Sequence, residues 1–426
     1  MHVASILRQV FSNRNIITLS STNMLYHIFN SLWELWWSLY LFEVLKTPIT
    51  IIGLLATIQN TSRILFQLPG GIIADRIGRK KVIVFGTGLR VLAPILLLFA
   101  KSWVWVIPGI VINSVASLYG PAFNAIIAES LPSERRGTAF GAYRALTSIP
   151  QVFMPVVSGY YLERMGVGPG VRVGLILFTC AAAIAVTVRA IFLTETLSPE
   201  DMGNDEQGNK VEEKGMIETF REMPRTIYAM LLVAVVSGFS MRMTWSFLSI
   251  YATNVIELST TQYGLLQSVA TGISVPLYLV SGFIADRFGR VPCILLARGL
   301  GPFDSLSLLL FKDFNQLVSA YGVIGIAGGL GGGRLRGGGY MGGPAWQALI
   351  ADIVPPRDRG KIMGLMGTVT GLIGLPGSYI GGYLYDLNPN LLLALGSGLE
   401  ALSIPIILFF VKEHKKPETL DSLPSS

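Results

Sequence analysis

The sequence predicts an all-α integral membrane protein in which twelve transmembrane helices form two pseudo-symmetric six-helix bundles. Three observations lead to this fold class. Of the 426 residues, 51% are apolar and only 14% are charged, whereas a soluble domain carries about 25% charged residues. The mean hydropathy of the chain is +0.55. Apolar stretches of membrane-spanning length recur along the whole chain, and one short polar motif occurs twice, about half a chain apart.

The repeated motif indicates that the chain is a duplication. Residues 71–79 read GIIADRIGR and residues 282–290 read GFIADRFGR, so Asp75 and Asp286 are 286 − 75 = 211 residues apart. A Gly-Pro-Ala triplet also occurs in each half, beginning at Gly120 and at Gly343, with a spacing of 343 − 120 = 223 residues. An internal repeat indicates that the two halves of the chain have the same architecture. The second half is therefore expected to contain an insertion of about twelve residues before Gly343.

Six stretches of the first half meet the requirement of about 20 mostly apolar residues for a membrane-spanning helix. Charged turns separate them: Lys46 follows the first, the motif follows the second, Lys101 follows the third, Glu129 and Arg136 flank the next turn, and Arg164 follows the fifth. The expected spans are residues 16–45, 49–70, 82–100, 103–128, 138–161 and 173–193.

The second half repeats this series after a polar interval. Residues 194–225 are rich in Glu, Asp, Gly and Asn, a composition typical of a solvated linker. The next spans are expected at residues 227–255, 261–282, 292–311, 315–350, 361–384 and 391–411. The chain thus divides into an N-terminal bundle (1–193), a cytoplasmic linker (194–225) and a C-terminal bundle with a cytoplasmic tail (226–426).

The positions of the basic residues predict the orientation in the membrane. Lys and Arg gather in the turns that follow even-numbered helices, which places these turns in the cytoplasm by the positive-inside rule. We therefore expect a multi-pass protein of the cell membrane with both termini cytoplasmic. The net charge of +7 belongs to these short turns and does not predict a nucleic-acid partner. Cys180 and Cys293 lie in apolar segments without the spacing of a disulfide framework or a metal site.

The motif has the chemistry of a conformational latch. Asp75 and Asp286 lie at helix ends, where a carboxylate can cap the amide groups of another helix. Arg79 and Arg290 need acidic partners, and glycines at positions 71 and 282 would let two helices approach closely. The expected latch residues are Gly71, Asp75, Arg76, Gly78, Arg79, Glu129 and Arg136 in the first half, and Gly282, Asp286, Arg287, Gly289, Arg290, Asp352 and Arg359 in the second.

These motifs resemble those of the major facilitator superfamily. The loop at 71–80 is similar to its G-x-L-A-D-R-x-G-R-K signature, and the runs Pro121–Glu129 and Pro344–Asp352 resemble its second cytoplasmic marker. The resemblance covers nearly the whole chain. It implies two bundles related by a two-fold axis along the membrane normal, a central substrate site and alternating access by rocking of the halves. It also implies that the latch stabilises the outward-facing state.

Ionisable residues inside membrane helices are the candidates for the substrate site, because they are costly there without a function or a partner. Glu34 lies deep in the first span, and His27 precedes it by seven residues, on the same helical face. A carboxylate beside aromatic residues on the first helix suits a proton-coupling site and resembles the acid that multidrug antiporters of the superfamily use for cationic drugs. A permanent ion pair with a buried arginine is the structural alternative.

Arginines and aromatic residues compete for the same region. Arg63, Arg144 and Arg242 are candidates for binding an anionic group or for holding Glu34 ionised. Arg90 and Arg298 also lie within spans, and Asp304 is a possible partner for Arg298. The predicted aromatic wall of the site contains Trp33, Trp37 and Trp245, with packing or lipid contact as the alternative for such residues.

The function that we expect is secondary transport of a small organic solute, most specifically proton-coupled efflux of amphipathic, drug-like compounds by a monomer without a cofactor. Uptake of a sugar-like or anionic solute through Arg63, Arg144 and Arg242 is the first alternative, and a non-transporting membrane sensor is the second. No motif of an enzyme is present in the sequence. The fifth span resembles the signature of the antiporter subfamilies only in part, which weakens the antiporter interpretation: Gly141, Pro155 and Gly159 fit, whereas Pro150, Met154 and Ser158 stand where glycines are expected. The Gly-rich insertion at 331–343 is expected to bulge from the tenth span or to break it.

Overall fold

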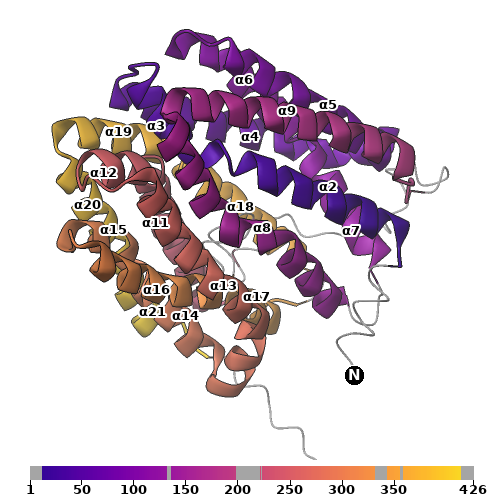
Figure 1. Ribbon diagram of the computed structural model, residues 1–426. Helices are drawn as coiled ribbons and strands as arrows, with labels where there is room; N and C mark the ends of the chain where they lie inside the picture. The colour runs from indigo at the N-terminus through magenta and orange to yellow at the C-terminus, as the bar shows by residue number, and fades with distance from the viewer. Residues whose placement is uncertain are drawn as a thin grey trace, which may run out of the picture.

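The computed structural model describes residues 12–131, 136–197, 221, 223–331, 343–355 and 358–413. These residues form helices joined by short turns, and no strand occurs among them. Figure 1 shows the first half of the chain, from α2 to α9, and the second half, from α11 to α21, as two helical bodies that lie side by side. The predicted all-α fold is therefore confirmed, although the exact domain boundaries at 193 and 226 stay a prediction.

In the first half, two of the six predicted spans contain more than one helical segment. The first consists of α2, the single-turn 3₁₀ helix η1 and α3, and the fourth consists of α6 and α7. The helices are α2 (Arg14–Asn30), η1 (Glu34–Trp36), α3 (Trp37–Glu43), α4 (Ile49–Ile77), α5 (Arg79–Leu98), α6 (Trp103–Ala116), α7 (Tyr119–Ser130), α8 (Arg136–Met165) and α9 (Val167–Phe192).

Interrupted spans are more frequent in the second half. The helices are α11 (Arg225–Trp245), α12 (Leu248–Asn254), α13 (Thr260–Phe288), α14 (Arg290–Gly299), α15 (Phe303–Leu310), α16 (Phe314–Gly331), α17 (Pro344–Ile353), α18 (Arg359–Ile373), α19 (Gly377–Leu387), α20 (Pro389–Ala401) and α21 (Ser403–Phe410). Among the described residues, eight stretches are long and apolar enough to cross a membrane. The other four predicted spans lie on α2–α3, α8, α16–α17 and α18–α19, which are helical at the expected places but shorter, broken or more polar.

Gly78 and Gly289 give the repeated motif its sharp turn. Their φ angles are 102° and 95°, a left-handed region that residues with a Cβ adopt only with strain. Each glycine separates two helices without a gap, α4 from α5 and α13 from α14. The turn therefore fixes the position of the motif arginine that follows immediately, Arg79 or Arg290.

The close helix approach predicted at Gly71 and Gly282 is not found in this structure. A Cβ at Gly71 would have only an ordinary contact with Pro121, and a Cβ at Gly282 would meet nothing within 4 Å. The close approach in this region occurs instead at Gly70, where a side chain would collide with the carbonyl of Leu118. Gly71 and Gly282 lie at the end of the molecule that carries Asp75 and Asp286, called here the motif end.

The halves meet at the opposite end, called here the far end, which carries Thr50 and Asp386. The amide of Thr50 donates to Asp386 over 3.0 Å, and the hydroxyl of Thr50 donates to the same carboxylate oxygen. The contact surfaces between the halves are formed by α4 against α19, α8 against α13 and α3 against α12. In Figure 1 the labels of α3, α12 and α19 gather where the two bodies touch.

Small residues make the second of these surfaces tight. The hydroxyl of Thr260 donates to the carbonyl of Gly159 over 2.7 Å, and a side chain at Gly264 would collide with the carbonyl of Pro155. Gly159 and Pro155 are two of the signature residues of the fifth span. They therefore belong to the seal between the halves at the far end.

The Gly-rich insertion lies outside the described residues, apart from its two ends. Helix α16 ends at Gly331 and the next described residue, Gly343, precedes α17. Gly343 lies directly against the backbone of Leu330 and Gly331, so close that a Cβ there would be 2.6 Å from the carbonyl oxygen of Leu330. The two parts of the tenth span, α16 and α17, are therefore adjacent in space at Gly331 and Gly343. That the insertion bulges from this span stays a prediction.

Candidate functional site

A cavity of about 390 Å³ lies in the first half, between the sealed far end and the motif end. All but two of its lining residues come from α2 to α8 and the turns between them, and the two exceptions, Val275 and Tyr278, come from α13. The lining residues are Asn23, Tyr26, His27, Asn30, Glu34, Gln59, Arg63, Gln67, Arg90, Asn113, Ser114, Ser117, Tyr119, Gly120, Phe123, Asn124, Ile127, Tyr143, Thr147, Ser148, Gln151, Val275 and Tyr278. Nearly all of these side chains carry a polar atom.

Helical periodicity explains why so many polar residues reach one cavity. On α4 the polar residues Gln59, Arg63 and Gln67 recur every four positions, which places them on one face of the helix. On α2, Asn23 and Asn30 are seven residues apart and share a face in the same way. Inside a membrane bundle such faces turn toward water or toward a ligand. The polar faces of α4 and α2 therefore line the same cavity.

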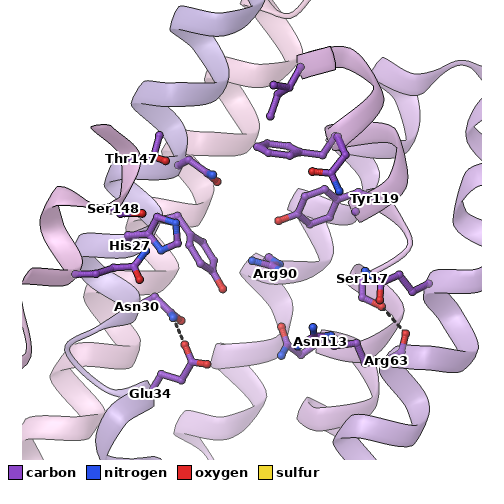
Figure 2. A pocket seen from close by; sticks show the side chains of 18 of the residues that line it. His27, Asn30, Glu34, Arg63, Arg90, Asn113, Ser117, Tyr119, Thr147 and Ser148 are labelled. Atoms are coloured by element: carbon purple, nitrogen blue, oxygen red, sulfur yellow. Dashed lines mark hydrogen bonds between the residues drawn. The ribbon is translucent and has the colours of Figure 1, made fainter. Parts of the chain in front are cut away.

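Glu34 lies at the side of the cavity formed by the first span. Asn30 ends α2, and its side-chain amide donates a hydrogen bond to the Glu34 carboxylate, as Figure 2 shows. Glu34 begins η1, so the helical face that was predicted to join it to His27 is interrupted after Asn30. Both side chains nevertheless line the cavity. The side chain of Glu34 is exposed to the cavity.

Arg90 on α5 lies in the centre of the cavity view, between Glu34 and Arg63 (Figure 2). The Cζ atom of Arg90 is 4.6 Å from the centroid of the Tyr26 ring and 4.9 Å from that of the Tyr119 ring. Such cation–π contacts stabilise a guanidinium in an environment poor in water. Arg90 was considered from the sequence but was not among the predicted site residues.

Arg189 on α9 is a second buried arginine, behind the wall of the cavity. Its side chain is only 2% exposed. Nε donates to the hydroxyl of Thr22 over 3.0 Å, and Nη1 donates to the hydroxyl of Thr87 over 2.8 Å. Its Cζ atom lies 5.4 Å from the centre of the Phe123 ring and 5.9 Å from that of Tyr119. Sequence reasoning missed this residue, although an arginine inside an apolar span is a visible signal.

Of the three arginines predicted for the site, the structure places one in the cavity. Arg63 lines it. Arg242 does not, because its Nη1 donates to the carbonyl of Gly371 over 2.9 Å and its side chain lies against Gly374, all within the second half. Arg144 lies on α8, and its side chain is outside the described part of the structure. Arg298 forms an ion pair with Glu400 at 3.6 Å.

The tryptophans of the predicted aromatic wall do not line this cavity. Trp33 is buried against Trp37 and Phe178 in the hydrophobic core of the bundle. Trp37 stacks on Tyr40, with 5.6 Å between the ring centres. Trp245 ends α11 and is 42% exposed. None of these tryptophans is among the residues that line the cavity, because the chain turns between Asn30 and Glu34 and directs Trp33 into the core.

The motif arginines form ion pairs with the acids predicted from the repeat. Arg79 pairs with Glu129 on α7 and, at 3.4 Å, with Asp75. In the second half Arg290 pairs with Asp352 on α17 and, at 3.7 Å, with Asp286. Both arginines also sit at helix N-termini.

The aspartates of the motif remain accessible in this conformation. The side chain of Asp75 is 59% exposed and that of Asp286 is 71% exposed. Arg359 donates to the carbonyls of Val354 and Ala351 and thereby caps α17. The side chain of Arg136 is outside the described residues. The role of these groups as a latch is not decided by their positions and stays a prediction.

A pair of carboxylates at the ends of the two bundles caps the helices that follow the motif. Glu195, just after α9, accepts a hydrogen bond from the amide of Lys80 over 2.9 Å. Glu413, just after α21, accepts from the amides of Arg290 and Val291, each over 2.8 Å. Lys80 and Val291 are equivalent in the repeat, so both halves cap this helix N-terminus with a carboxylate. It was not predicted, because the two carboxylates are far from the motif in sequence.

Comparisons with known proteins agree with the fold. The family model described as Major Facilitator Superfamily matches residues 19–340 and 335–425. The chain is 22% identical to an uncharacterized MFS-type transporter of Methanocaldococcus jannaschii, over 84% of this chain and 85% of that protein. It is 20% identical to a class H tetracycline resistance protein of Pasteurella multocida, over 87% and 89% of the two chains. It is 22% identical to multidrug resistance protein 2 of Bacillus subtilis, over 79% and 80%.

Solved structures show the same fold at low sequence identity. The nucleoside transporter NupG superposes with a TM-score of 0.74 at 14% identity, over 93% of this chain and 100% of that chain. A bacterial homolog of the human lysosomal transporter Spinster, in an inward-facing and unoccupied conformation, superposes with a TM-score of 0.63 at 18% identity, over 93% and 94% of the two chains. Because the family model covers nearly the whole chain, the protein belongs to the Major Facilitator Superfamily.

Proposed function

We propose that this chain is a proton-coupled exporter of a small amphipathic organic solute, which binds in the cavity of the first half. The observation that carries the proposal is the position of Glu34. Its carboxylate is exposed to the cavity and is held there by Asn30, on a span whose helix is broken at this point. An accessible carboxylate can bind either a proton or a cationic group of the solute, which is what exchange of the two requires.

The conformation supports transport by alternating access. The halves are in contact at the far end through Thr50 and Asp386, whereas the aspartates at the motif end are exposed and the cavity lies between the two ends. By the positive-inside rule the motif end is cytoplasmic. We therefore interpret this structure as an inward-facing state, in which the solute enters from the cytoplasm. Two of the related proteins are named for tetracycline or multidrug resistance, which supports export as the direction.

Uptake of a polar or anionic solute is the second candidate. Arg63 and Arg90 line the same cavity as Glu34, and nearly all of the lining side chains are polar. Proton-coupled uptake would use Glu34 in its protonated form together with an anion at the arginines. Uptake therefore requires that solute and proton bind together, whereas export by exchange requires that they compete.

Reconstituted liposomes with a pH-sensitive dye inside distinguish the two candidates. Tetracycline, tetraphenylphosphonium, glucose and benzoate are added in turn with an imposed proton gradient, and solute flux and dye signal are recorded together. The proposal predicts proton movement opposite to the solute for tetracycline or tetraphenylphosphonium, lost in Glu34→Gln and kept in the surface control Glu257→Gln. Flux of glucose or benzoate alone, with proton movement in the same direction or none, would contradict it.

A further inference from the structure

We infer that the transported solute is a zwitterion, whose cationic group binds at Glu34 and whose anionic group binds at Arg90 and Arg63. This inference rests on the proposed function and specifies the substrate class of the same cavity. It follows from the separation of opposite charges on two walls. Figure 2 shows Glu34 and Asn30 at one side of the cavity, Arg63 at the other and Arg90 between them.

The wall formed by the first span suits a cationic group. Asn30 holds the Glu34 carboxylate through one oxygen, and a carboxylate offers about four lone-pair positions for hydrogen bonds. The side chain of Glu34 is exposed to the cavity, so a solute can reach the carboxylate. An ammonium group is the partner that such an acceptor binds most strongly.

The geometry of Arg90 suits an anionic group. The rings of Tyr26 and Tyr119 lie within 4.9 Å of its Cζ atom, and the hydroxyl of Tyr26 also accepts a hydrogen bond from the guanidinium. The Nε atom of Arg90 is buried, and no described residue accepts a hydrogen bond from it. A buried N–H without an acceptor is uncommon in proteins and often marks the place of a water or a ligand. The planar fork of a guanidinium matches a carboxylate or a phosphate oxygen pair.

Arg189 shows what an arginine with a purely structural role looks like in the same bundle. It contacts Tyr119 as Arg90 does, but its Nε and Nη1 donate to the hydroxyls of Thr22 and Thr87. It does not line the cavity. Arg90 differs from Arg189 in both respects, because it faces the cavity and keeps a donor without a protein acceptor. Two arginines of one bundle thus serve different purposes.

Proton exchange is most favourable when one solute carries both charges. A cation alone would compete with the proton at Glu34, but it would be repelled by Arg90 and Arg63. An anion alone would bind best when Glu34 is protonated, so it would travel with the proton instead of against it. A zwitterion places an opposite charge at Glu34 and at the two arginines. Its cationic group displaces the proton from Glu34, and its anionic group neutralises the arginines.

Size-matched probes test the inference without a proton gradient. The probes are 4-(aminomethyl)benzoate, a zwitterion near neutral pH, 4-methylbenzoate, an anion, and 4-methylbenzylamine, a cation. Apparent Kd values are obtained from the thermal stabilisation of the purified full chain in detergent. We expect the zwitterion to bind about tenfold or more tightly than either single-charge probe, which corresponds to one additional charged contact.

Two substitutions assign the charges to the two walls. Glu34→Gln is expected to make the zwitterion bind no better than the anion, and Arg90→Gln is expected to make it bind no better than the cation. Arg164→Gln is the matched control, since Arg164 also lies over a tyrosine ring, at 5.1 Å from the centre of Tyr160, but on the outer surface. If Arg90→Gln does not fold, Arg63→Gln takes its place with the same expected result.

The outcomes separate this inference from the proposed function. Equal binding of the three probes, preference for a single-charge probe or no binding of the zwitterion would overturn the inference. If the zwitterion binds as expected but evokes no proton movement in liposomes, zwitterion recognition stands and proton exchange is wrong. If tetraphenylphosphonium exchanges for protons while the zwitterion does not bind, proton exchange stands and zwitterion recognition is wrong.

Discussion

Arg79 forms an ion pair with Glu129, and the same pair recurs in the second half between Arg290 and Asp352. In both halves the arginine also contacts the motif aspartate one helical turn before it. The aspartates themselves are turned to solvent. In each half the arginine has its acidic partner within the same half, and the motif aspartate stays accessible. This aspartate is therefore suited to bind the other half when the halves close at the motif end.

The first prediction concerns this accessible carboxylate. We expect Asp75→Asn to favour the inward-facing state by about fivefold, because a carboxylate that caps helix amides in the opposite state contributes about 1 kcal/mol. The measurement is the rate of maleimide labelling of Ser148→Cys in the cavity, after replacement of Cys180 and Cys293. Asp313→Asn, an exposed N-terminal helix cap far from the motif, is the control. An unchanged labelling rate in Asp75→Asn would show that Asp75 does not act as a latch.

The second prediction concerns the carboxylates that cap α5 and α14. Glu195→Ala and Glu413→Ala should each lower the free energy of unfolding by about 1 kcal/mol, since each leaves amides at a helix N-terminus without an acceptor. Thermal unfolding in detergent measures the change. Equal losses of stability in the two halves would support the view that both halves use the same helix cap. No loss of stability in either variant would show that water replaces the capping carboxylate without cost.

The third prediction concerns backbone strain in the motif. Gly78→Ala and Gly289→Ala should each destabilise the protein by about 1 kcal/mol, because both positions need a positive φ. Gly282→Ala is the matched control within the same motif, since a Cβ there meets nothing in this conformation. Thermal unfolding of the three variants compares them directly. A control that loses as much stability as the other two would contradict the explanation from the turn.

The fourth prediction separates the two buried arginines. Arg189→Lys should destabilise the protein by about 2 kcal/mol, because lysine cannot donate to Thr22 and Thr87 from one planar group, and a buried group would lose its partner. The apparent Kd of 4-(aminomethyl)benzoate should stay within about twofold, since Arg189 does not line the cavity. Arg90→Lys should weaken the binding of 4-(aminomethyl)benzoate and leave the stability of the protein nearly unchanged. A loss of affinity in Arg189→Lys at full stability would place Arg189 in the binding site.

Much of the fold could be predicted from the sequence because its signals are local or repeated. Apolar length located the spans, and the motif repeat identified Glu129 and Asp352 as partners of the motif arginines before any contact was known. Glu34 and Arg63 were found because an ionisable residue in an apolar span is conspicuous. The row Gln59, Arg63 and Gln67 carried a further signal, its four-residue period, that would have located the polar wall of the cavity.

Other features could not be predicted, because they depend on packing between distant segments. No glycine or proline marks the break of the first span at Ser31–Trp33, so the sequence did not show that Trp33 turns into the core. Arg298 forms an ion pair with Glu400, which lies three spans later in the chain. The contact of Arg90 with Tyr26 and Tyr119 joins three helices and appears only after folding.

Competition between solute and proton at Glu34 is the central claim, and proton release from the purified protein tests it most directly. 4-(Aminomethyl)benzoate and tetracycline are added to weakly buffered, detergent-purified chain, and the change in pH is recorded for the wild type, Glu34→Gln and the control Glu257→Gln. The account predicts proton release on solute binding in the wild type and the control, and none in Glu34→Gln. Proton uptake on binding, or release that persists in Glu34→Gln, would contradict it.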